Sequence, residues 1–426
     1  MQQTDPYASP RARYYALCVL TIVYTFNFID RQLLAILQES IKADLLLSDS
    51  QLGLLTGFAF ALFYVTAGIP IARWADNSNR RNIVALAVGT WSFMTAISGA
   101  VQSYAQLLLA RVGVGVGEAG GSPPAHSMIS DIFPPERRAG ALSFYSMGVN
   151  IGILFGFLLG GWLNEFFNWR IAFVVVGLPG VLIALLVRFT LHEPIRGMAD
   201  QRAAADKAEP LRAVLTLLWQ RVSFRHMALG AAANAFAVYS MNSWTASFMI
   251  RSFGLSSGEV GSWLALILGA GGAAGLLSGG LLAQRLARRD VRWYNWVSAV
   301  ASLIAVPFAA ATFVADTAAT ALVCFIVPGF LATVYLGNTL AMVHGLVGLR
   351  MRAVASAILF FVLNIIGLGI GPWSVGLLSD YLRPDLGVES LRYALLYLVP
   401  AAFVWSAFHF LRASRFLRAD LDAAPA

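Results

Sequence analysis

Apolar segments long enough to cross a lipid bilayer recur along the whole of this chain. They are roughly 20 residues long or longer and return about every 30–35 residues, and a helix needs about 20 apolar residues to cross a hydrocarbon core about 30 Å thick. Only 12% of the 426 residues are charged, against about 25% in soluble domains. A membrane β-barrel would need short segments of alternating hydropathy, which this sequence lacks. The sequence therefore predicts a polytopic, all-α membrane protein.

The apolar segments define twelve predicted transmembrane helices, six in each half of the chain. In the first half we place them at residues 14–41, 50–74, 81–103, 104–132, 137–165 and 169–191. In the second half we place them at residues 222–252, 256–284, 292–315, 317–348, 352–381 and 390–414. The loops on the side of the N-terminus hold most of the Lys and Arg residues, so the positive-inside rule places both termini in the cytoplasm. The basic residues that give the net charge of +8 lie where this topology places them, so we expect no nucleic-acid partner.

A polar interval divides the chain into two halves. Residues 192–211 hold small, charged and proline residues and no apolar run, so we interpret them as a cytoplasmic linker. The predicted N-terminal six-helix bundle is then 1–191, and the C-terminal bundle is 212–426. Because an even number of spans precedes the linker, both halves have the same orientation, as in a parallel repeat.

Paired arginines mark corresponding places in the two halves. The loop "ARWADNSNRRN" after the second span and the loop "GLLAQRLARRD" after the eighth both resemble the G-x-x-x-D-R-x-G-R-R signature of the major facilitator superfamily. Within that family, "FNFIDRQ", "RVGVGVGEAGGSP" and "DIFPPERRAGA" resemble the spinster-like branch. The resemblance implies the major facilitator fold, with twelve transmembrane helices in two pseudo-symmetric six-helix bundles. It also implies a secondary transporter that works by alternating access.

Four charged residues fall inside the predicted spans of the first half. Asp30 and Arg31 lie on the first span, and Arg111 and Glu118 lie on the fourth. A charge at the bilayer centre costs at least about 2.5–3.5 kcal/mol, so these residues should face a cavity and one another. From the rise per residue, Asp30 and Arg111 reach a similar depth, which makes an ion pair between them geometrically possible. Glu118 shares a helical face with Arg111 and lies about 10 Å deeper.

Two interpretations of these charges remain open. In the structural interpretation, an Asp30–Arg111 pair only holds the first and fourth helices together, although buried ion pairs stabilise little. In the functional interpretation, a carboxyl group in a low-dielectric cavity exchanges protons, and an arginine beside it trades that carboxylate for an anionic substrate. Glu118 has no obvious neighbouring cation, so burial should favour its protonated form most, and it is the first choice for the proton carrier. Arg31 then remains for a gate or for a substrate anion. The resemblance likewise implies proton coupling through these positions.

Other residues are candidates for gates and for the substrate cavity. The resemblance implies a cytoplasmic gate in which Asp76 accepts hydrogen bonds from a helix N-terminus or from Arg137 and Arg138. The other basic members of this gate motif are Arg80, Arg81, Arg285, Arg288 and Arg289. The candidate substrate or gating residues besides Arg31 are Asn27, Tyr24, Asn234, Tyr239, Asn242, Trp244, Tyr335 and Asn338. Packing is the simpler explanation for each of these residues taken singly.

No motif for catalysis, metal binding or ATP hydrolysis is found in the sequence, so we expect neither an enzyme nor a cofactor. We expect a proton-coupled secondary transporter for a lipid-like or amphipathic organic anion. We expect it to lie as a monomer in the cell (inner) membrane, in contact with membrane lipids. A small organic-acid/proton symporter is the alternative within transport. An uncoupled lipid scramblase or membrane binding protein is the alternative of another class. Symport, antiport and uniport all remain compatible with the sequence.

Overall fold

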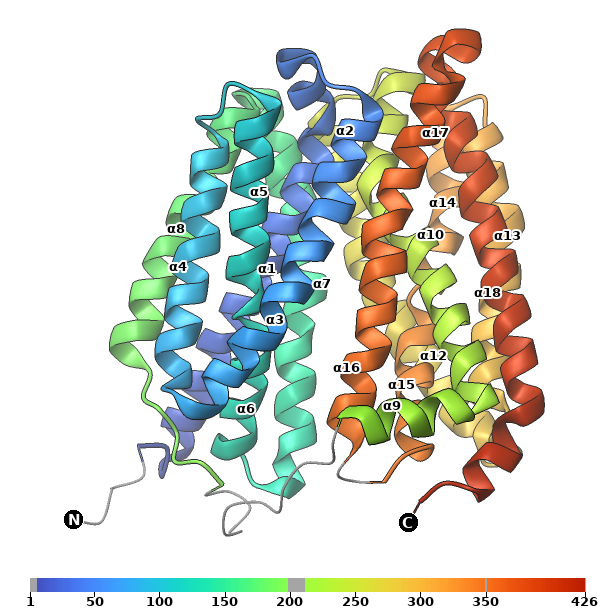
Figure 1. Cartoon of the computed structure of the whole chain (residues 1–426). Helices are drawn as coiled ribbons and strands as arrows, with labels where there is room; N and C mark the ends of the chain where they lie inside the picture. Colours follow the sequence, from blue (N-terminus) through green and yellow to red (C-terminus); the bar gives the residue numbers. More distant parts are fainter. Residues whose placement is uncertain (1–5, 198–210, 349–350, 426) are drawn as a thin grey trace. The chain divides into compact units, whose positions relative to one another are not determined.

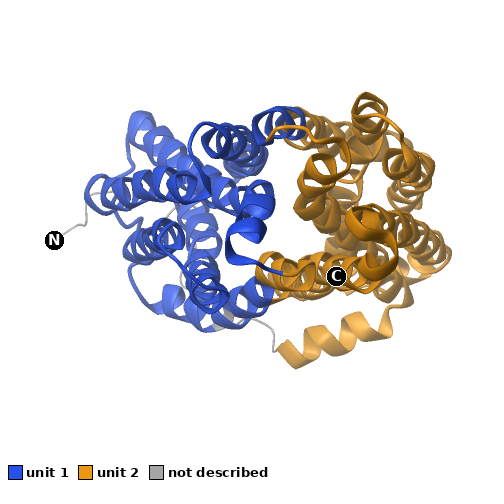
Figure 2. Ribbon diagram, turned by 90° about the horizontal axis from the view of Figure 1, so that it is seen from above, with its two compact units in different colours: residues 1–47, 59–206, 257–265 blue, residues 48–58, 207–256, 266–426 orange. Residues whose placement is uncertain are grey.

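The computed structural model describes residues 6–197, 211–348 and 351–425, and within these ranges the chain is helical without any strand (Figure 1). Its contacts divide the chain into two compact units (Figure 2). Unit 1 draws on Met1–Leu47, Ala59–Asp206 and Ser257–Ala265, and unit 2 draws on Ser48–Phe58, Lys207–Ser256 and Leu266–Ala426. Of the predicted linker, residues 198–210 lie outside the described residues.

The helices of unit 1 come mainly from the first half of the chain. They are α1 (Pro10–Leu45), α3 (Ala59–Asn77), α4 (Arg80–Ser98), α5 (Tyr104–Ala119), α6 (Ser122–Ile132), α7 (Pro135–Phe166), α8 (Trp169–Thr190) and α11 (Ser257–Leu264).

Unit 2 holds most of the second half. Its helices are α2 (Asp49–Gly53), the π-helix η1 (Leu54–Phe58), α9 (Leu211–Gln220), α10 (Val222–Phe253), α12 (Gly272–Ala287), α13 (Trp293–Val314), α14 (Ala318–Leu331), α15 (Val334–Gly345), α16 (Arg352–Val362), the π-helix η5 (Leu363–Ile370), α17 (Gly371–Leu386), η6 (Gly387–Glu389) and α18 (Ser390–Asp422). A further π-helix, η3 (Ala265–Gly271), begins at the unit boundary.

The predicted spans are confirmed as helical segments whose ends lie close to the predicted ones. The fourth predicted span is interrupted, because α5 ends at Ala119 and α6 begins at Ser122. Pro123 and Pro124 follow at once, and proline lacks the N–H that a continuous helix would need there. The tenth predicted span is likewise divided, between α14 and α15.

Eight helical segments within the described ranges are long and apolar enough to cross a membrane by length and composition. One of them, Arg352–Asp422, combines the last two predicted spans. Some predicted spans are not among these eight segments, for local reasons. The fourth span is divided into α5 and α6, which are separate pieces of 16 and 11 residues. The seventh span, α10, carries polar residues such as Asn234 and Asn242 along its length.

Helix pairing recurs between the two units, as the internal repeat predicts. In unit 1, α4 packs along α8, and in unit 2 the corresponding helices α13 and α18 pack together. Likewise α1 packs along α7, and α10 packs along η5. The helices that correspond by sequence therefore also correspond in their neighbours.

Two helical segments change unit within their length. The pieces α2 and η1 pack on α17 in unit 2, whereas α3, which continues them, packs on α5 in unit 1. In the second half, α11 packs on α7 in unit 1, and α12 belongs to unit 2. A π-helical turn lies at each change, η1 in one case and η3 in the other. Such turns are common at functional sites in helices. The bundles predicted at 1–191 and 212–426 follow chain order and stay a prediction.

Glycines let α7 pack directly against the backbone of α1. Gly148, Gly152, Gly156 and Gly160 recur every four residues, so they line one side of α7. A Cβ atom on Gly152 would lie 2.5 Å from the Thr25 carbonyl oxygen. The close approach of the two helices therefore depends on the missing side chains.

We expect Gly152→Ala to destabilise the protein, because the added methyl group meets backbone that cannot move aside. Overpacking of this kind costs about 1–3 kcal/mol, which thermal unfolding in detergent would register as a lower midpoint. Gly140→Ala, in the same helix, is the matched control, since a Cβ atom at that position would meet no described atom within 4 Å. Equal midpoints for the two variants would contradict this packing.

Candidate functional site

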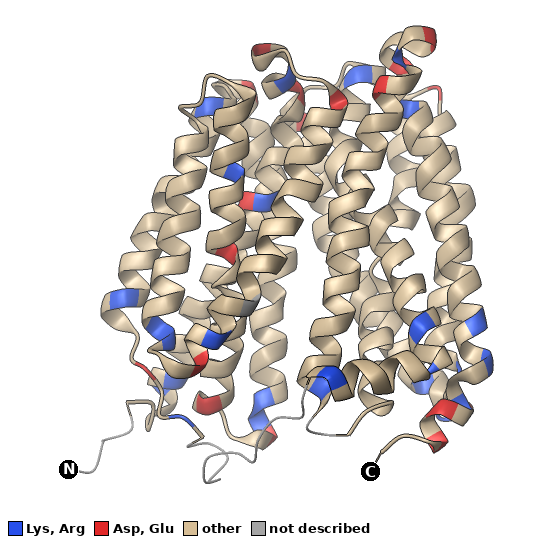
Figure 3. Cartoon of the chain, in the orientation of Figure 1, with Lys and Arg blue, Asp and Glu red and all other residues tan. Residues whose placement is uncertain are grey.

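A small group of charged residues lies halfway along the helices of unit 1, while most other charges lie near helix ends (Figure 3). The four residues predicted to be embedded are Asp30 and Arg31 on α1, and Arg111 and Glu118 on α5. Asp30, Arg111 and Glu118 are at most 2% exposed. Burial to this degree requires that each charge be offset by a partner nearby.

Arg31 is the partner of Glu118. Its Nε atom donates to Glu118 Oε2 at 2.6 Å, and the Glu118 side chain is fully buried. The expectation that Glu118 has no neighbouring cation, and that Arg31 is left over, is therefore wrong. Arg31 follows Asp30 directly, and the turn between successive residues directs the two side chains to different partners.

Asp30 is bound by a hydroxyl group, which the sequence analysis did not anticipate. The Thr95 hydroxyl on α4 donates to Asp30 Oδ2 at 2.6 Å. Among the described residues, Asp30 Oδ1 has no hydrogen-bond partner, and neither do Nε and Nη1 of Arg111. The predicted Asp30–Arg111 ion pair is thus not formed, although the two groups lie close enough to interact electrostatically. Thr95 is a common residue in an apolar helix, and nothing in its sequence context marked it.

Aromatic rings surround the two guanidinium groups. The Arg31 guanidinium carbon lies 4.9 Å from the ring centre of Phe28 and 5.0 Å from those of Phe60 and Tyr64. Phe60 also receives Arg111, at 5.5 Å. A cation over an aromatic face gains about 2 kcal/mol or more when both are desolvated. These rings therefore compensate part of the cost of burying two arginines.

The predicted substrate residues beside this group also meet aromatic neighbours. Tyr24 stacks on Tyr145 with ring centres 4.4 Å apart, and it also contacts Phe28 edge to face. Asn27, one turn before Asp30, is 4% exposed. Whether either residue contacts a substrate stays a prediction.

The glycines of α5 serve helix packing. A Cβ atom on Gly117 would lie 2.8 Å from the backbone nitrogen of Trp91 on α4. One on Gly115 would lie 3.2 Å from the Phe60 carbonyl oxygen on α3. Neighbouring helices thus occupy the space that the glycines leave, and α5 holds Arg111 and Glu118 close to α3 and α4.

Most candidates in the second half are packed within unit 2. The Asn234 amide donates to Ser302 Oγ, and the Asn338 amide donates to Ser298 Oγ. Trp244 has no exposed surface, and its indole N–H donates to the Pro372 carbonyl oxygen at 2.8 Å. Whether Trp244 contacts a substrate stays a prediction. The remaining candidates, which stay predictions, are the buried Tyr335 and the half-buried Tyr239 and Asn242.

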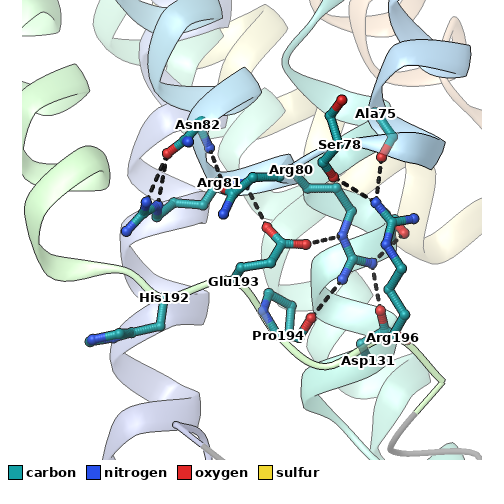
Figure 4. A network of polar contacts seen from close by, with 12 residues as sticks. Ala75, Ser78, Arg80, Arg81, Asn82, Asp131, His192, Glu193, Pro194 and Arg196 are labelled. Atoms are coloured by element: carbon teal, nitrogen blue, oxygen red, sulfur yellow. Dashed lines mark hydrogen bonds and ion pairs between the residues drawn. The ribbon is translucent and has the colours of Figure 1, made fainter. Parts of the chain in front are cut away.

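The first copy of the gate motif is centred on Arg80, which is 1% exposed (Figure 4). Its Nη1 atom donates to Asp131 at the end of α6, and its Nε atom donates to Glu193 Oε1 at 2.7 Å. Its Nη2 atom donates to the Pro194 carbonyl oxygen at 2.9 Å. Glu193 Oε2 also accepts the backbone N–H of Arg81. Arg80 therefore binds the segment that follows α8 to the loop between α3 and α4.

Further contacts hold the same segment. Arg196 donates through Nη2 to the carbonyl oxygens of Ala75 and Ser78, at 2.6 and 2.7 Å (Figure 4). The Gly197 N–H donates to Asp131 Oδ1 at 3.0 Å. The start of the predicted linker is thus an ordered part of unit 1. Its residues Glu193 and Arg196 were missed because a polar interval was interpreted as linker alone.

The acidic residue of the first gate-motif copy lies outside this network. Asp76 is exposed and has no hydrogen bond or ion pair within the described part of the chain. Arg137 is exposed, and so are all three arginines of the second copy, Arg285, Arg288 and Arg289. Arg138 is half-buried. The predicted contacts of Asp76 are therefore not formed in this structure.

Beside the second copy, Asp290 is the residue that forms ion pairs. It binds Arg292, through a side-chain and a backbone N–H, and Arg418 on α18. The Arg292 hydrogen bonds hold the pKa of the Asp290 carboxyl group below its usual range. Asp290 directly follows the paired arginines, and this position is the sequence feature from which its ion pairs could have been predicted.

Unit 2 also holds a network of polar contacts around Asp49 that was not predicted from the sequence. Asp49, at the start of α2, accepts two hydrogen bonds of 2.7 Å from Arg251 at the end of α10. The Ser379 hydroxyl donates to the same carboxylate, and Asp380 accepts the backbone N–H groups of Asp49 and Ser50. Asp49 is fully buried, so this network fixes α2 to α17. Its members are far apart in sequence, and no local pattern joined them.

We expect Arg80→Gln to lower the thermal unfolding midpoint, because it leaves buried acceptors without their donor. The cost of an unsatisfied buried group is about 1–3 kcal/mol, and more for charged groups. Arg288→Gln, at the corresponding exposed position of the second copy, should leave the midpoint unchanged. If the two variants unfold at the same temperature, the Arg80 network is not structural.

Comparison with known proteins agrees with this architecture. The sequence profile of the Major Facilitator Superfamily matches residues 20–372. An MFS-type efflux pump of Mycolicibacterium smegmatis is 37% identical over 97% of this chain and 95% of its own length. A cis,cis-muconate transport protein of Acinetobacter baylyi is 27% identical over 88% of this chain and 90% of its own length.

Among solved structures, a bacterial homologue of the human lysosomal transporter Spinster, in an inward-facing and unoccupied conformation, is similar to this chain. Its TM-score is 0.82 and its identity 32%, covering 97% of this chain and 98% of that one. The fold, the motif loops and these relatives together show that the chain is a multi-pass membrane transporter, not an enzyme, that belongs to the spinster-like branch of the Major Facilitator Superfamily.

Proposed function

We propose that this transporter couples the movement of an amphipathic organic anion to protons by alternating access, through Glu118, Asp30, Arg111 and Arg31. We also propose that it lies in the cell (inner) membrane with both termini in the cytoplasm, since the basic loops lie on that side of the predicted topology. The proposal rests on one observation: within the described residues, the Nε and Nη1 atoms of Arg111 have no hydrogen-bond acceptor.

Arg111 is the proposed site for the anion. Its guanidinium is 2% exposed, and two of its nitrogen atoms have no acceptor within the described residues. A buried donor without an acceptor is costly. A guanidinium presents parallel N–H groups that match the two oxygens of a carboxylate or phosphate. An anionic substrate group would therefore satisfy Arg111 better than the protein does.

Charge balance links the anion to protons. With both acids ionised, the two arginines and two carboxylates sum to zero. A bound monovalent anion would leave one uncompensated negative charge in a buried site, and such a charge is strongly destabilising. Protonation of one acid restores neutrality. We infer that the site takes up about one proton for each negative charge that it binds, because an unpaired buried ion is so costly.

Glu118 and Asp30 would play different parts in that exchange. Protonating Glu118 weakens its contact with Arg31, which favours an anion near that guanidinium. Within the described residues, Asp30 Oδ1 has no hydrogen-bond partner, and the ionised form of Asp30 would repel an anion held by Arg111. Proton binding and anion binding thus favour each other at both acids, as linkage requires.

Aromatic residues supply the apolar part of the proposed recognition. Tyr24 contacts both Phe28 and Tyr145, and Phe28 lies beside Arg31. Together with the resemblance to the spinster branch, they favour a lipid-like or amphipathic anion. The similarity to a muconate transport protein favours a small organic acid as the second candidate. Competition between lysolipids and dicarboxylates for the same binding site would separate the two.

We expect Glu118→Gln to abolish accumulation of the anion driven by a pH gradient in proteoliposomes. Glutamine reproduces the charge of a protonated glutamate, so anion binding should persist and lose the part of its pH dependence that comes from Glu118. Glu136→Gln, at an exposed position, is the control and should accumulate substrate like the unmodified protein. Accumulation by Glu118→Gln at the unmodified rate would overturn the proposed coupling. Equilibration of substrate by the unmodified protein, without any response to the gradient, would indicate an uncoupled scramblase.

We expect Arg111→Gln to weaken anion binding about tenfold or more, since hydrogen bonds to charged groups contribute about 1.5–3 kcal/mol. Ligand-dependent thermal shift would measure this, because a ligand stabilises the state that it binds. Arg288→Gln should bind as the unmodified protein does. An unchanged affinity in Arg111→Gln would exclude Arg111 as the anion site.

A further inference from the structure

The short helix α9 lies across the ends of the long helices of unit 2. Figure 1 shows it beside the lower ends of α15 and α16, and Figure 2 shows it at the edge of unit 2. It is followed after one residue by α10, a predicted span. A helix in this place lies at the depth where a span leaves the bilayer, whatever the substrate of the transporter is.

One side of α9 is packed into unit 2. Val214 and Leu218 are at most 1% exposed and belong to a core cluster with Met227 on α10 and with Ala355 and Leu359 on α16. These contacts fix the rotation of α9 about its own axis. The directions of its other side chains then follow from the helical repeat.

A second side of α9 is apolar and exposed. Leu211, Leu215 and Trp219 are 58%, 44% and 72% exposed. They are four residues apart, so they form one stripe along the helix. Arg212, Thr216 and Gln220, also exposed, form the next row, about 100° further around. The apolar stripe therefore lies between the packed side and the polar side.

This order of faces fits a helix in the plane of a membrane interface. Such helices direct an apolar side toward the acyl chains and a polar side toward water. Tryptophan is enriched at that depth. If this side of α9 faced water, Leu211, Leu215 and Trp219 would form an exposed apolar patch, which soluble surfaces rarely carry.

The charge around α9 indicates which lipids it meets. Residues 211–225 contain Arg212, Arg221 and Arg225 and no Asp or Glu. The Arg225 guanidinium lies 5.8 Å from the Trp219 ring centre, which places a cation beside the end of the apolar stripe. Basic residues next to an interfacial helix attract anionic headgroups.

We propose that α9 is an interfacial anchor that recognises a leaflet of anionic phospholipid. Leu211, Leu215 and Trp219 enter the boundary between headgroups and acyl chains, and Arg212 and Arg225 bind phosphate-bearing anionic headgroups. The occupant of this face is the bilayer itself. The proposal is independent of the substrate and of proton coupling.

Spin-label accessibility at single cysteines tests the anchor. The two native cysteines, Cys18 and Cys324, are replaced by serine, and Leu215→Cys and Thr216→Cys are labelled separately in full-length protein. The vesicles are phosphatidylcholine with or without phosphatidylglycerol. The Leu215→Cys label should collide more with oxygen and less with an aqueous nickel chelate, and Thr216→Cys should show the opposite. Adding phosphatidylglycerol should deepen the Leu215→Cys label, and Arg212→Gln should reduce that shift.

Both positions are exposed, so the labels leave the packed side of α9 intact, and an unchanged elution volume and unfolding midpoint in detergent would verify this. Equal access of the nickel chelate to both labels in both kinds of vesicle would overturn insertion of the stripe, and would favour a protein partner or none. Equal depth of the Leu215→Cys label with and without phosphatidylglycerol would overturn recognition of anionic headgroups.

Discussion

The cost of placing ions among apolar helices governs this structure. Unit 1 holds two arginines and two carboxylates in its interior, and their arrangement limits that cost in three ways. Arg31 and Glu118 neutralise each other at 2.6 Å. Aromatic rings cover both guanidinium groups, with Phe60 shared between them. The Thr95 hydroxyl donates to Asp30 at 2.6 Å, although Asp30 and Arg111 form no ion pair within the described residues and keep unsatisfied polar atoms. We propose that this site, which is neutral overall and incompletely hydrogen-bonded, binds an anion together with a proton.

The rest of unit 1 positions these side chains. Glycines on α5 and α7 allow these helices to approach the backbone of their neighbours, which holds α1, α3 and α4 around the charged group. At one end of the unit, Arg80 joins the loop after α3 to the segment after α8. Unit 2 combines neutral amide and hydroxyl groups, such as Asn234 and Ser302, with the buried ion pair between Asp49 and Arg251.

The fold could be predicted from the sequence, because hydrocarbon admits few alternatives to apolar helices of sufficient length. The identity of the embedded charges was equally accessible, since they interrupt apolar runs. Their pairing was not. Depth along a helix gave Asp30 and Arg111 similar heights, but pairing also depends on the rotation of each helix and on its neighbours. Thr95 from α4 satisfied Asp30 instead, and Arg31 turned toward Glu118. The Asp49–Arg251 and Arg80–Glu193 contacts escaped prediction for a related reason, since each joins distant segments without a local pattern.

In the proposed mechanism, the group of four buried charges in unit 1 takes up a proton when it binds an anion. Proton uptake can be measured directly, by adding saturating ligand to purified protein in weakly buffered detergent with a pH indicator near neutral pH. We expect uptake of about one proton for each negative charge bound, because charge neutrality of the buried site sets the ratio. Binding of the anion without any proton uptake would contradict it.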